Sequence, residues 1–295
     1  MAILGTCLCG AVRYEVEGPF DPMMHCHCSM CRKHHGSAFA TFVSAPLASF
    51  RWVAGEEQIA TYASSEQGVR RFCPTCGSVA PTLVPEIDRA ICPAGNLVGD
   101  LPVRPQYHVF VGSKAPWFQI TDELPQYAEY PPEFGASGVA RAPRVTKPGV
   151  VTGSCLCGAV TYEVSGQPKR MLNCHCWRCR RSRSAAHATN LAHDVAEFAF
   201  TSGAENVRPY KVPEAQRFTI AFCKQCGSAT PCAPSSIAIV PAGTLDNDPG
   251  ARASDHIFVG SKASWFTITD QLPQWETVPS VLSLQTELAK RTGDG

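Results

Sequence analysis

The sequence lacks the features that would place the protein in a membrane, outside the cell or on nucleic acid. Its 26 basic and 25 acidic residues give a formal net charge of +1, so no broad positive field for nucleic acid is expected. No apolar stretch reaches the roughly 20 residues that a bilayer span requires. The opening residues, MAILGTC, have no basic n-region and no long apolar core, so we expect no signal peptide. These absences favour a soluble cytoplasmic protein.

Cysteine, by contrast, is abundant: the 295 residues include 16 cysteines. In a chain without an export signal, we expect these cysteines to be thiols or thiolates in a reducing compartment. Several pairs are spaced Cys-x-Cys, and a disulfide that closed so short a loop would be strained. On a tight turn, both thiolates can instead converge on a metal.

Fourteen of the cysteines form two similar sets of seven, each arranged in groups of two, three and two. The first set is Cys7, Cys9, Cys26, Cys28, Cys31, Cys73 and Cys76. The second set is Cys155, Cys157, Cys174, Cys176, Cys179, Cys223 and Cys226. Seven sulfurs divide into four plus three zinc ligands, which predicts one closed and one open zinc site in each half of the chain.

The two sets belong to an internal duplication. Residues 5–17 recur as 153–165, and residues 108–125 recur as 256–273, both at an offset of 148. This period is far too long for a solenoid, so the repeat is a duplicated domain. Residues 281–292 have helical spacing and predict a terminal helix or a frayed tail. The predicted boundaries are a first domain over 1–130, a linker over 131–150, a second domain over 151–278 and a tail over 279–295.

Within each copy, the pattern is mostly that of β-strands. Short alternating or apolar segments are separated by glycine and proline, and proline is too frequent for long helices. We therefore expect a mostly β fold with one or two short helical turns. The strand candidates in the first copy are Ala11–Val16, Ala38–Val43, Gln58–Tyr62, Ala90–Pro93 and His108–Val111.

The four-cysteine group of the first copy has the pattern of a structural zinc site. Cys73-x-x-Cys76-Gly is a zinc knuckle, whose turn directs two sulfurs at one point while the glycine permits a positive φ. The pair Cys7-x-Cys9, also followed by glycine, completes four sulfurs. Such a site contributes directly to the free energy of folding. The second copy has the same pattern.

The three-cysteine group, Cys26, Cys28 and Cys31, leaves one coordination position for water, a thiol or a side chain. A nearby histidine would close this site and make it structural. The candidates for that role are His25, His27, His34 and His35, of which only His27 persists in the second copy, as His175. Zinc with three thiolates is electron-rich and suits the binding of an incoming thiol better than the activation of water.

These motifs together resemble the glutathione-dependent formaldehyde-activating enzyme family, also called GFA or centromere protein V-like. The resemblance rests on the Cys-x-Cys-Gly-Ala-Val opening, HCHCSMCRKHHGSAF (25–39), FCPTCG (72–77) and HVFVGSKAPWFQITDELPQY (108–127), and it covers both copies. It implies a mostly β, Mss4-like fold with two zinc ions per domain, up to four per chain. It also implies a carbon–sulfur lyase that joins formaldehyde to glutathione as S-hydroxymethylglutathione, or the reverse.

The resemblance suggests candidate residues around the open site of the first copy. Arg32 and Lys33 are candidate contacts for the carboxylates of glutathione, although two solvated surface cations are an equal interpretation. Ser37 is a third candidate contact. The second copy departs from the family pattern because its residues 184–187 read SAAH where residues 36–39 read GSAF. The first copy is therefore the expected catalytic half, with Cys26, Cys28 and Cys31 binding the thiol.

Two functions remain open at this point. The first is a zinc-dependent lyase acting on glutathione or another small thiol, and the second is a zinc-stabilised binding module without chemistry. Chromatin binding rests only on the centromere protein V resemblance, and the neutral net charge counts against it. His108 and His256, which open the last repeated segment, are predicted to be hydrogen-bonded core histidines rather than site residues.

Overall fold

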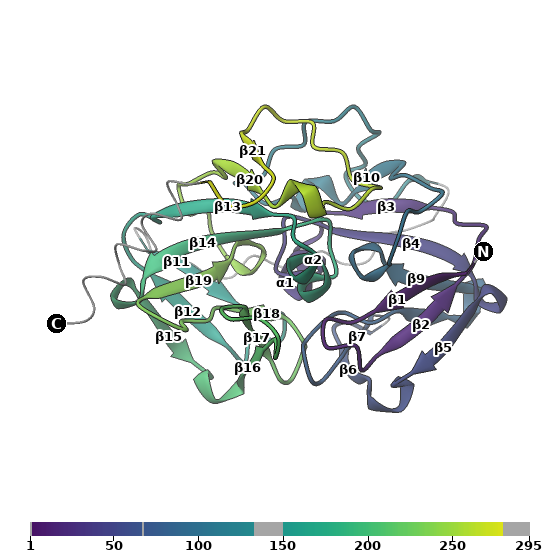
Figure 1. Ribbon diagram of the computed structural model, residues 1–295, viewed down its shortest axis with the longest axis horizontal. Coiled ribbons are helices and arrows are strands. Elements are labelled where there is room, and N and C mark those ends of the chain that lie inside the picture. Colours follow the sequence, from purple (N-terminus) through teal and green to yellow (C-terminus); the bar gives the residue numbers. More distant parts are fainter. Residues whose placement is uncertain (1, 67, 133–149, 280–295) are drawn as a thin grey trace.

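The computed structural model describes residues 2–66, 68–132 and 150–279 (Figure 1). The fold is mostly β, as predicted, with two α-helices in the described residues, α1 (Ser29–His35) and α2 (Trp177–Arg183). Neither helix has the length or the apolar run that a membrane span requires. Nearly all of the predicted linker (131–150) and tail (279–295), including the candidate helix at 281–292, lies outside the described residues.

Each half contains about the same series of short strands. Those of the first half are β1 (Ile3–Thr6), β2 (Arg13–Val16), β3 (Met23–Cys26), β4 (Ala40–Pro46), β5 (Phe50–Ala54), β6 (Ala60–Ala63), β7 (Val69–Phe72), β8 (Thr82–Val84), β9 (Arg89–Pro93) and β10 (Tyr107–Val109). Those of the second half are β11 (Val151–Ser154), β12 (Thr161–Val164), β13 (Arg170–Cys174), β14 (Ala188–Asp194), β15 (Phe198–Ser202), β16 (Val207–Lys211), β17 (Thr219–Cys223), β18 (Ala229–Thr230), β19 (Ile237–Pro241), β20 (Asp255–Ile257) and β21 (Gln274–Trp275).

Each of the five predicted strand segments overlaps an observed strand, with shifted ends. The segment predicted from Gln58 starts at Ala60 instead, because residues 56–58 form a 3₁₀ turn. The segment predicted to reach Val111 ends at Val109, because Phe110 has a left-handed φ of 58° that breaks the extended backbone.

Each half builds a three-stranded and a five-stranded sheet, and the larger sheet positions the site. In the first half its strand order is β10-β3-β4-β9-β8, with β3 parallel to β10 and antiparallel to β4. This register places His25 beside both His108 and Thr41. In the second half the order is β19-β14-β13-β20-β21. Because side chains alternate along a strand, His25 and Cys26 point to opposite faces of β3.

The α-helices are short because both ends are fixed by local geometry. In α1, the Cys28 sulfur accepts a hydrogen bond from the N–H of Cys31 at the beginning of the helix. The helix ends at Gly36, which has a left-handed φ of 63°. A Cβ at Gly36 would lie 2.5 Å from the Cβ of Ala229 in the other half, so the site requires glycine for space as well as for conformation. In α2 the corresponding left-handed residue is Ser184.

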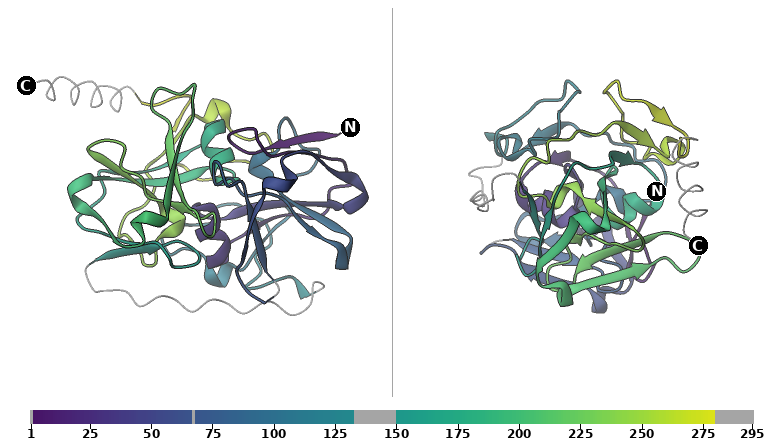
Figure 2. Two further views of the ribbon diagram at one scale, coloured as in Figure 1. Left: turned by 90° about the horizontal axis from the view of Figure 1, so that it is seen from below. Right: turned by 90° about the vertical axis from the view of Figure 1, so that its left-hand side faces the viewer.

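The two halves lie side by side and share one hydrophobic core (Figures 1 and 2). The core includes Tyr14 and Trp117 from the first half together with Tyr162 and Trp265 from the second. Each helix packs against a 3₁₀ turn of the other half: α1 against Ala242–Thr244, and α2 against Ala94–Asn96. The backbones approach so closely that a Cβ at Gly95 or Gly243 would overlap the opposite backbone. The two domains are therefore interlocked.

Polar contacts also cross between the halves, and one of them is a buried ion pair. Lys33 Nζ lies 2.6 Å from Asp246 Oδ1, and the side chains are only 12% and 6% exposed. The Lys33 ammonium also donates to the carbonyl and hydroxyl oxygens of Ser154. Lys33 therefore has partners inside the interface, and the prediction that it contacts the carboxylates of glutathione finds no support in this geometry.

Replacing Asp246 with asparagine should destabilise the whole chain. The substitution leaves the Lys33 ammonium buried without its counter-charge, which typically costs about 3–5 kcal/mol. The control is Asp194→Asn, which breaks an ion pair with Lys169 that is 47% exposed on both sides and should cost less than about 1 kcal/mol. Urea unfolding measures both. Unchanged stability of Asp246→Asn with a raised KM for glutathione would instead return Lys33 to the substrate site.

Candidate metal centres

The four-cysteine group of the first half has sulfur spacings that fit tetrahedral zinc. Its pairs come from the turn after β1 and from the knuckle after β7. Cys7 Sγ lies 3.5 Å from Cys9 Sγ, which lies 3.6 Å from Cys73 Sγ. Zinc–sulfur bonds of about 2.3 Å in a tetrahedron place the sulfurs about 3.8 Å apart. All four sulfurs, including that of Cys76, lie within 4.8 Å of one another, so this group could hold a metal ion.

The second half repeats this centre with Cys155, Cys157, Cys223 and Cys226. Cys157 Sγ lies 3.4 Å from Cys155 Sγ and 3.8 Å from Cys223 Sγ. In each centre, a backbone N–H donates to the first sulfur, from Val12 to Cys7 and from Val160 to Cys155. Hydrogen bonds from the neighbouring thiols lower the pKa of Cys76, and the bond from Cys7 has the largest effect. One sulfur in each crowded group is thereby favoured as thiolate, the form that binds metal.

Each four-cysteine centre is covered by side chains from the opposite half. Met30 and Tyr62 of the first half pack against the cluster around Cys155, while Trp177 and Tyr210 of the second pack against the cluster around Cys7. The knuckle glycines take part as well. A Cβ on Gly77 would overlap the Phe222 ring, and one on Gly227 would overlap the Phe72 ring. The metal centres therefore belong to the same packed unit as the shared core.

The three-cysteine group of the first half lies where β3 leads into α1. Cys26 ends the strand, Cys28 precedes the helix and Cys31 lies in its first turn. Their sulfurs lie within 4.8 Å of one another, and among the described residues no histidine or carboxylate joins the group. Cys26 and Cys31 are buried, whereas Cys28 is half-buried. The group thus offers three sulfurs, and Cys28 is the least buried of the three residues.

The nearby histidines are directed elsewhere, which argues against the closed alternative. His25 Nδ1 is 2.8 Å from Thr41 Oγ1, His27 Nε2 is bonded to His108, and His35 Nδ1 donates to the Arg183 carbonyl. Neither ring nitrogen of buried His34 has a hydrogen-bond partner. Burial lowers the pKa of His34 to about 3, so its imidazole is neutral.

Arg70 is a functional candidate that the sequence reasoning missed. Hairpin β6–β7 carries it to the three-cysteine group, where its Nη1 donates to Cys31 Sγ at 3.5 Å and its Nε donates to Ser64. Burial opposes its charge, but the Cys31 and Cys28 sulfurs raise the pKa of Arg70 overall. The sequence repeat could have indicated Arg70. At the offset of 150 that relates the two zinc knuckles, Arg70 aligns with the apolar Ile220, so the two halves differ at this position.

The three-cysteine group of the second half, Cys174, Cys176 and Cys179, has different surroundings. The Phe218 ring packs against it, where the first half has Gly68 at the aligned position. Arg183, at the end of α2 and 5% exposed, donates to Asn190 and lies near Cys179. The second group therefore has an aromatic ring where the first half has a glycine, and the guanidinium near it is buried more deeply than that of Arg70.

The remaining predicted glutathione contacts lie close to the three-cysteine group but are enclosed. Arg32 is only 9% exposed. Ser37 is 1% exposed, and its hydroxyl donates to the carbonyl of His187 in the other half at 2.7 Å. Ser37 therefore contributes to the interface between the halves, and of the three predicted contacts only Arg32 has a free donor.

His108 and His256 are buried and hydrogen-bonded, as expected, and each is the centre of a three-residue chain. His27 Nε2 lies 2.8 Å from His108 Nδ1, and His108 Nε2 lies 3.0 Å from Asp122. His175, His256 and Asp270 form the same chain. A carboxylate only accepts, so His108 donates to Asp122 and accepts from His27. The aspartates were missed, although the repeated ITD of 120–122 and 268–270 marks them.

Comparison with known proteins agrees with the duplicated architecture. The sequence profile of the glutathione-dependent formaldehyde-activating enzyme (GFA) family matches residues 2–113 and again residues 150–261. These matches cover most of the chain, and the protein belongs to this family. The two matched ranges contain both cysteine sets, so each half is one copy of the GFA domain.

Individual relatives match parts of the chain. A Halomonas elongata protein, provisionally named as a glutathione-dependent formaldehyde-activating enzyme, is 30% identical over 151 residues, which is 48% of this chain and 96% of that protein. An uncharacterized lyase of Schizosaccharomyces pombe is 34% identical over 74 residues, 25% of this chain and 52% of that protein. A crystal structure of a Rhodobacter sphaeroides protein shares 31% identity over 34% of this chain and 91% of its own, with a TM-score of 0.28.

Proposed function

We propose that the first half carries a glutathione-dependent carbon–sulfur lyase site, with zinc held by Cys26, Cys28 and Cys31. The reaction joins the glutathione sulfur to the carbon of formaldehyde to give S-hydroxymethylglutathione, or reverses that step. The observation that carries the proposal is a three-sulfur group with one half-buried cysteine and a partly buried guanidinium beside it. Family membership and the name of the Halomonas relative support the choice of thiol and aldehyde.

The chain's own residues would prepare this site for a thiol. When bound, zinc would supply a Lewis-acidic centre that favours the thiolate form of an incoming thiol. The Arg70 guanidinium offsets the negative charge that accumulates when a further sulfur joins three thiolates. Arg32, close to Cys28, adds a second cation. Holding thiolate and aldehyde together would supply most of the rate gain.

The second half has a structural role in this proposal. Phe218 packs against its three-cysteine group, and Ile220 stands where the first half has Arg70. Both of its cysteine groups still have zinc-compatible geometry, so we propose up to four zinc ions per chain. We also propose a cytoplasmic location, where the thiols remain reduced.

The first experiment combines metal content with adduct formation. Elemental analysis of the purified full chain should give about four zinc ions, by the two-sites-per-copy count. Exchange between glutathione and its hydroxymethyl adduct, followed by ¹³C NMR with labelled formaldehyde, should then be faster with the protein than without it. Four zinc ions with no acceleration would favour the alternative function, a zinc-stabilised binding module without chemistry.

Replacing Arg70 with glutamine should raise KM for glutathione about tenfold, the size expected from one lost charge-assisted hydrogen bond. Zinc content should not change, because the three sulfurs remain. The control is Arg71→Gln, the same substitution one residue along the strand, which should leave KM unchanged. Equal effects of the two substitutions would count against a specific role for Arg70.

A further inference from the structure

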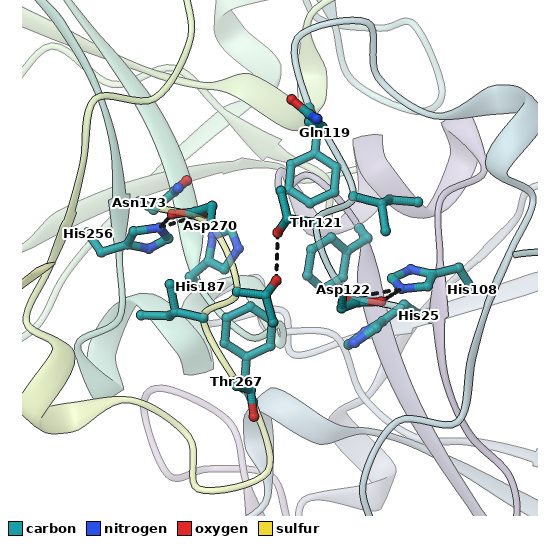
Figure 3. Close-up of a pocket in the computed structure, with 16 residues that line it drawn as sticks. His25, His108, Gln119, Thr121, Asp122, Asn173, His187, His256, Thr267 and Asp270 are labelled. Carbon is teal, nitrogen blue, oxygen red and sulfur yellow. Dashed lines mark hydrogen bonds and ion pairs between the residues drawn. The ribbon is translucent and has the colours of Figure 1, made fainter. Parts of the chain in front are cut away.

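A polar pocket lies between the halves (Figure 3). Its volume is about 30 Å³. The first half contributes His25, His108 and Asp122 to its lining. The second half contributes His187, His256 and Asp270. All four histidines are at most 3% exposed, whereas the lining residues Gln119, Thr121, Thr267 and Thr269 are exposed, so the pocket has a buried floor and an open rim.

Two loops meet across the pocket. Thr121 Oγ1 and Thr269 Oγ1 lie 2.6 Å apart and form a hydrogen bond between the halves. Figure 3 shows this bond crossing the middle of the site, with His25 and His187 on opposite sides of it. Phe118 and Phe266, from the same loops, add apolar rings to the lining. The pocket therefore combines imidazoles, two carboxylates and aromatic walls.

The polar groups do not fit a metal ion. Both ring nitrogens of His108 are already bonded, to His27 and Asp122, and both nitrogens of His256 are bonded to His175 and Asp270. The metal-binding groups found in the described residues are the four cysteine groups, and none includes these side chains. A cation would have to break both hydrogen-bonded chains.

An anion is also disfavoured, because two carboxylates line the pocket. Burial lowers the pKa of His187 to about 3, so its imidazole is neutral. A neutral guest that donates hydrogen bonds suits these acceptors, and its carbon can lie against the phenylalanine rings. A water-sized group needs about 10–15 Å³ of such a volume, so the pocket has room for roughly two or three non-hydrogen atoms.

We propose that this pocket binds a small neutral hydroxylic molecule, either a geminal diol or a one- or two-carbon alcohol. A geminal diol suits the pocket, since its three non-hydrogen atoms match that room and its hydroxyls can donate to Asp122 or to Asp270, which line it. Methanediol, the hydrate of formaldehyde, belongs to this class. The site is separate from the three cysteines, because His25 and Cys26 point to opposite faces of the strand.

The asymmetry of the pocket provides a matched variant. At an offset of 148, His25 aligns with Asn173, and Phe39 aligns with His187. His187→Phe therefore installs the residue that the first half already has, and it removes one polar wall while filling the pocket. Thr269→Val, which breaks the loop-to-loop hydrogen bond, serves as a second variant if His187→Phe does not fold.

The test is NMR of the imidazole ¹⁵N signals in the zinc-loaded full chain, titrated separately with methanediol, methanol and ethylene glycol. We expect a saturable shift of the His187 signal with methanediol that persists in Cys28→Ser, and weaker saturation by the two alcohols. In His187→Phe and in Thr269→Val, binding is followed through the His256 signal. Methanediol should bind to each variant at least tenfold more weakly than to the wild type. Non-saturating shifts, or equal binding by wild type and variants, would overturn the proposal.

This test does not depend on catalysis at the cysteines. Saturable binding to the pocket together with no adduct formation would contradict the proposed lyase and leave the pocket proposal intact. Adduct formation without saturable binding would contradict the pocket proposal and leave the lyase intact. Stronger saturation by methanol or ethylene glycol than by methanediol would assign the site to alcohols rather than to diols.

Discussion

Replacing Cys28 with serine should lower the rate of S-hydroxymethylglutathione exchange by a factor on the order of 100 or more, because the open zinc centre would lose a thiolate ligand. Cys28 is the half-buried member of its group, so the change affects the least buried cysteine of the site. The fold should persist, since the four-cysteine centres are untouched. Exchange kinetics, zinc content and thermal unfolding of the same preparation measure the three effects.

The matched control is Cys176→Ser, the same substitution at the aligned position of the second half. It should remove about one zinc ion per chain, as Cys28→Ser does, by the one-metal-per-group count. It should leave the exchange rate close to that of the wild type, because the proposed catalytic group lies in the first half and keeps its three sulfurs. Equal losses in the two variants would show that both halves are catalytic and that Phe218 does not close the second site.

The metal centres were predictable because their ligands are encoded locally. Cys-x-Cys, Cys-x-Cys-x-x-Cys and Cys-x-x-Cys-Gly each place sulfurs together through one turn, so spacing alone identified all fourteen cysteines that the structure gathers into four groups. The mostly β character followed from short alternating segments for the same reason. The duplication was visible as repeated text, and the family profile matches both copies.

What the sequence did not reveal depends on contacts between distant segments. Arg70 reaches Cys31 only because hairpin β6–β7 folds over it. Lys33, a predicted glutathione contact, is paired with Asp246, 213 residues away. No local pattern distinguishes a cation that pairs across an interface from one that faces solvent. The left-handed C-terminal residues of the two helices, Gly36 and Ser184, also differ in type although their backbones agree.

Replacing Cys226 with serine should unfold both halves, although Cys226 lies far from the proposed catalytic cysteines in sequence. A structural zinc site contributes about 10–16 kcal/mol in small zinc domains, which equals or exceeds the total stability of a typical protein. The centre is also not isolated, because Tyr62 and Met30 of the first half pack against it. Circular dichroism and zinc content should show a single loss of structure rather than the loss of one domain.

The control for this substitution lies in the same half. Cys232 lies outside all four groups, and its thiol donates a hydrogen bond to the Thr219 carbonyl at 3.6 Å. The Cys232→Ser chain should therefore remain folded with full zinc content. A Cys226→Ser chain that unfolded in its second half yet kept exchange activity in the first would contradict the shared core. Because α1, which carries Cys31, packs directly on the Ala242–Thr244 turn of the second half, we expect the activity to disappear with the fold.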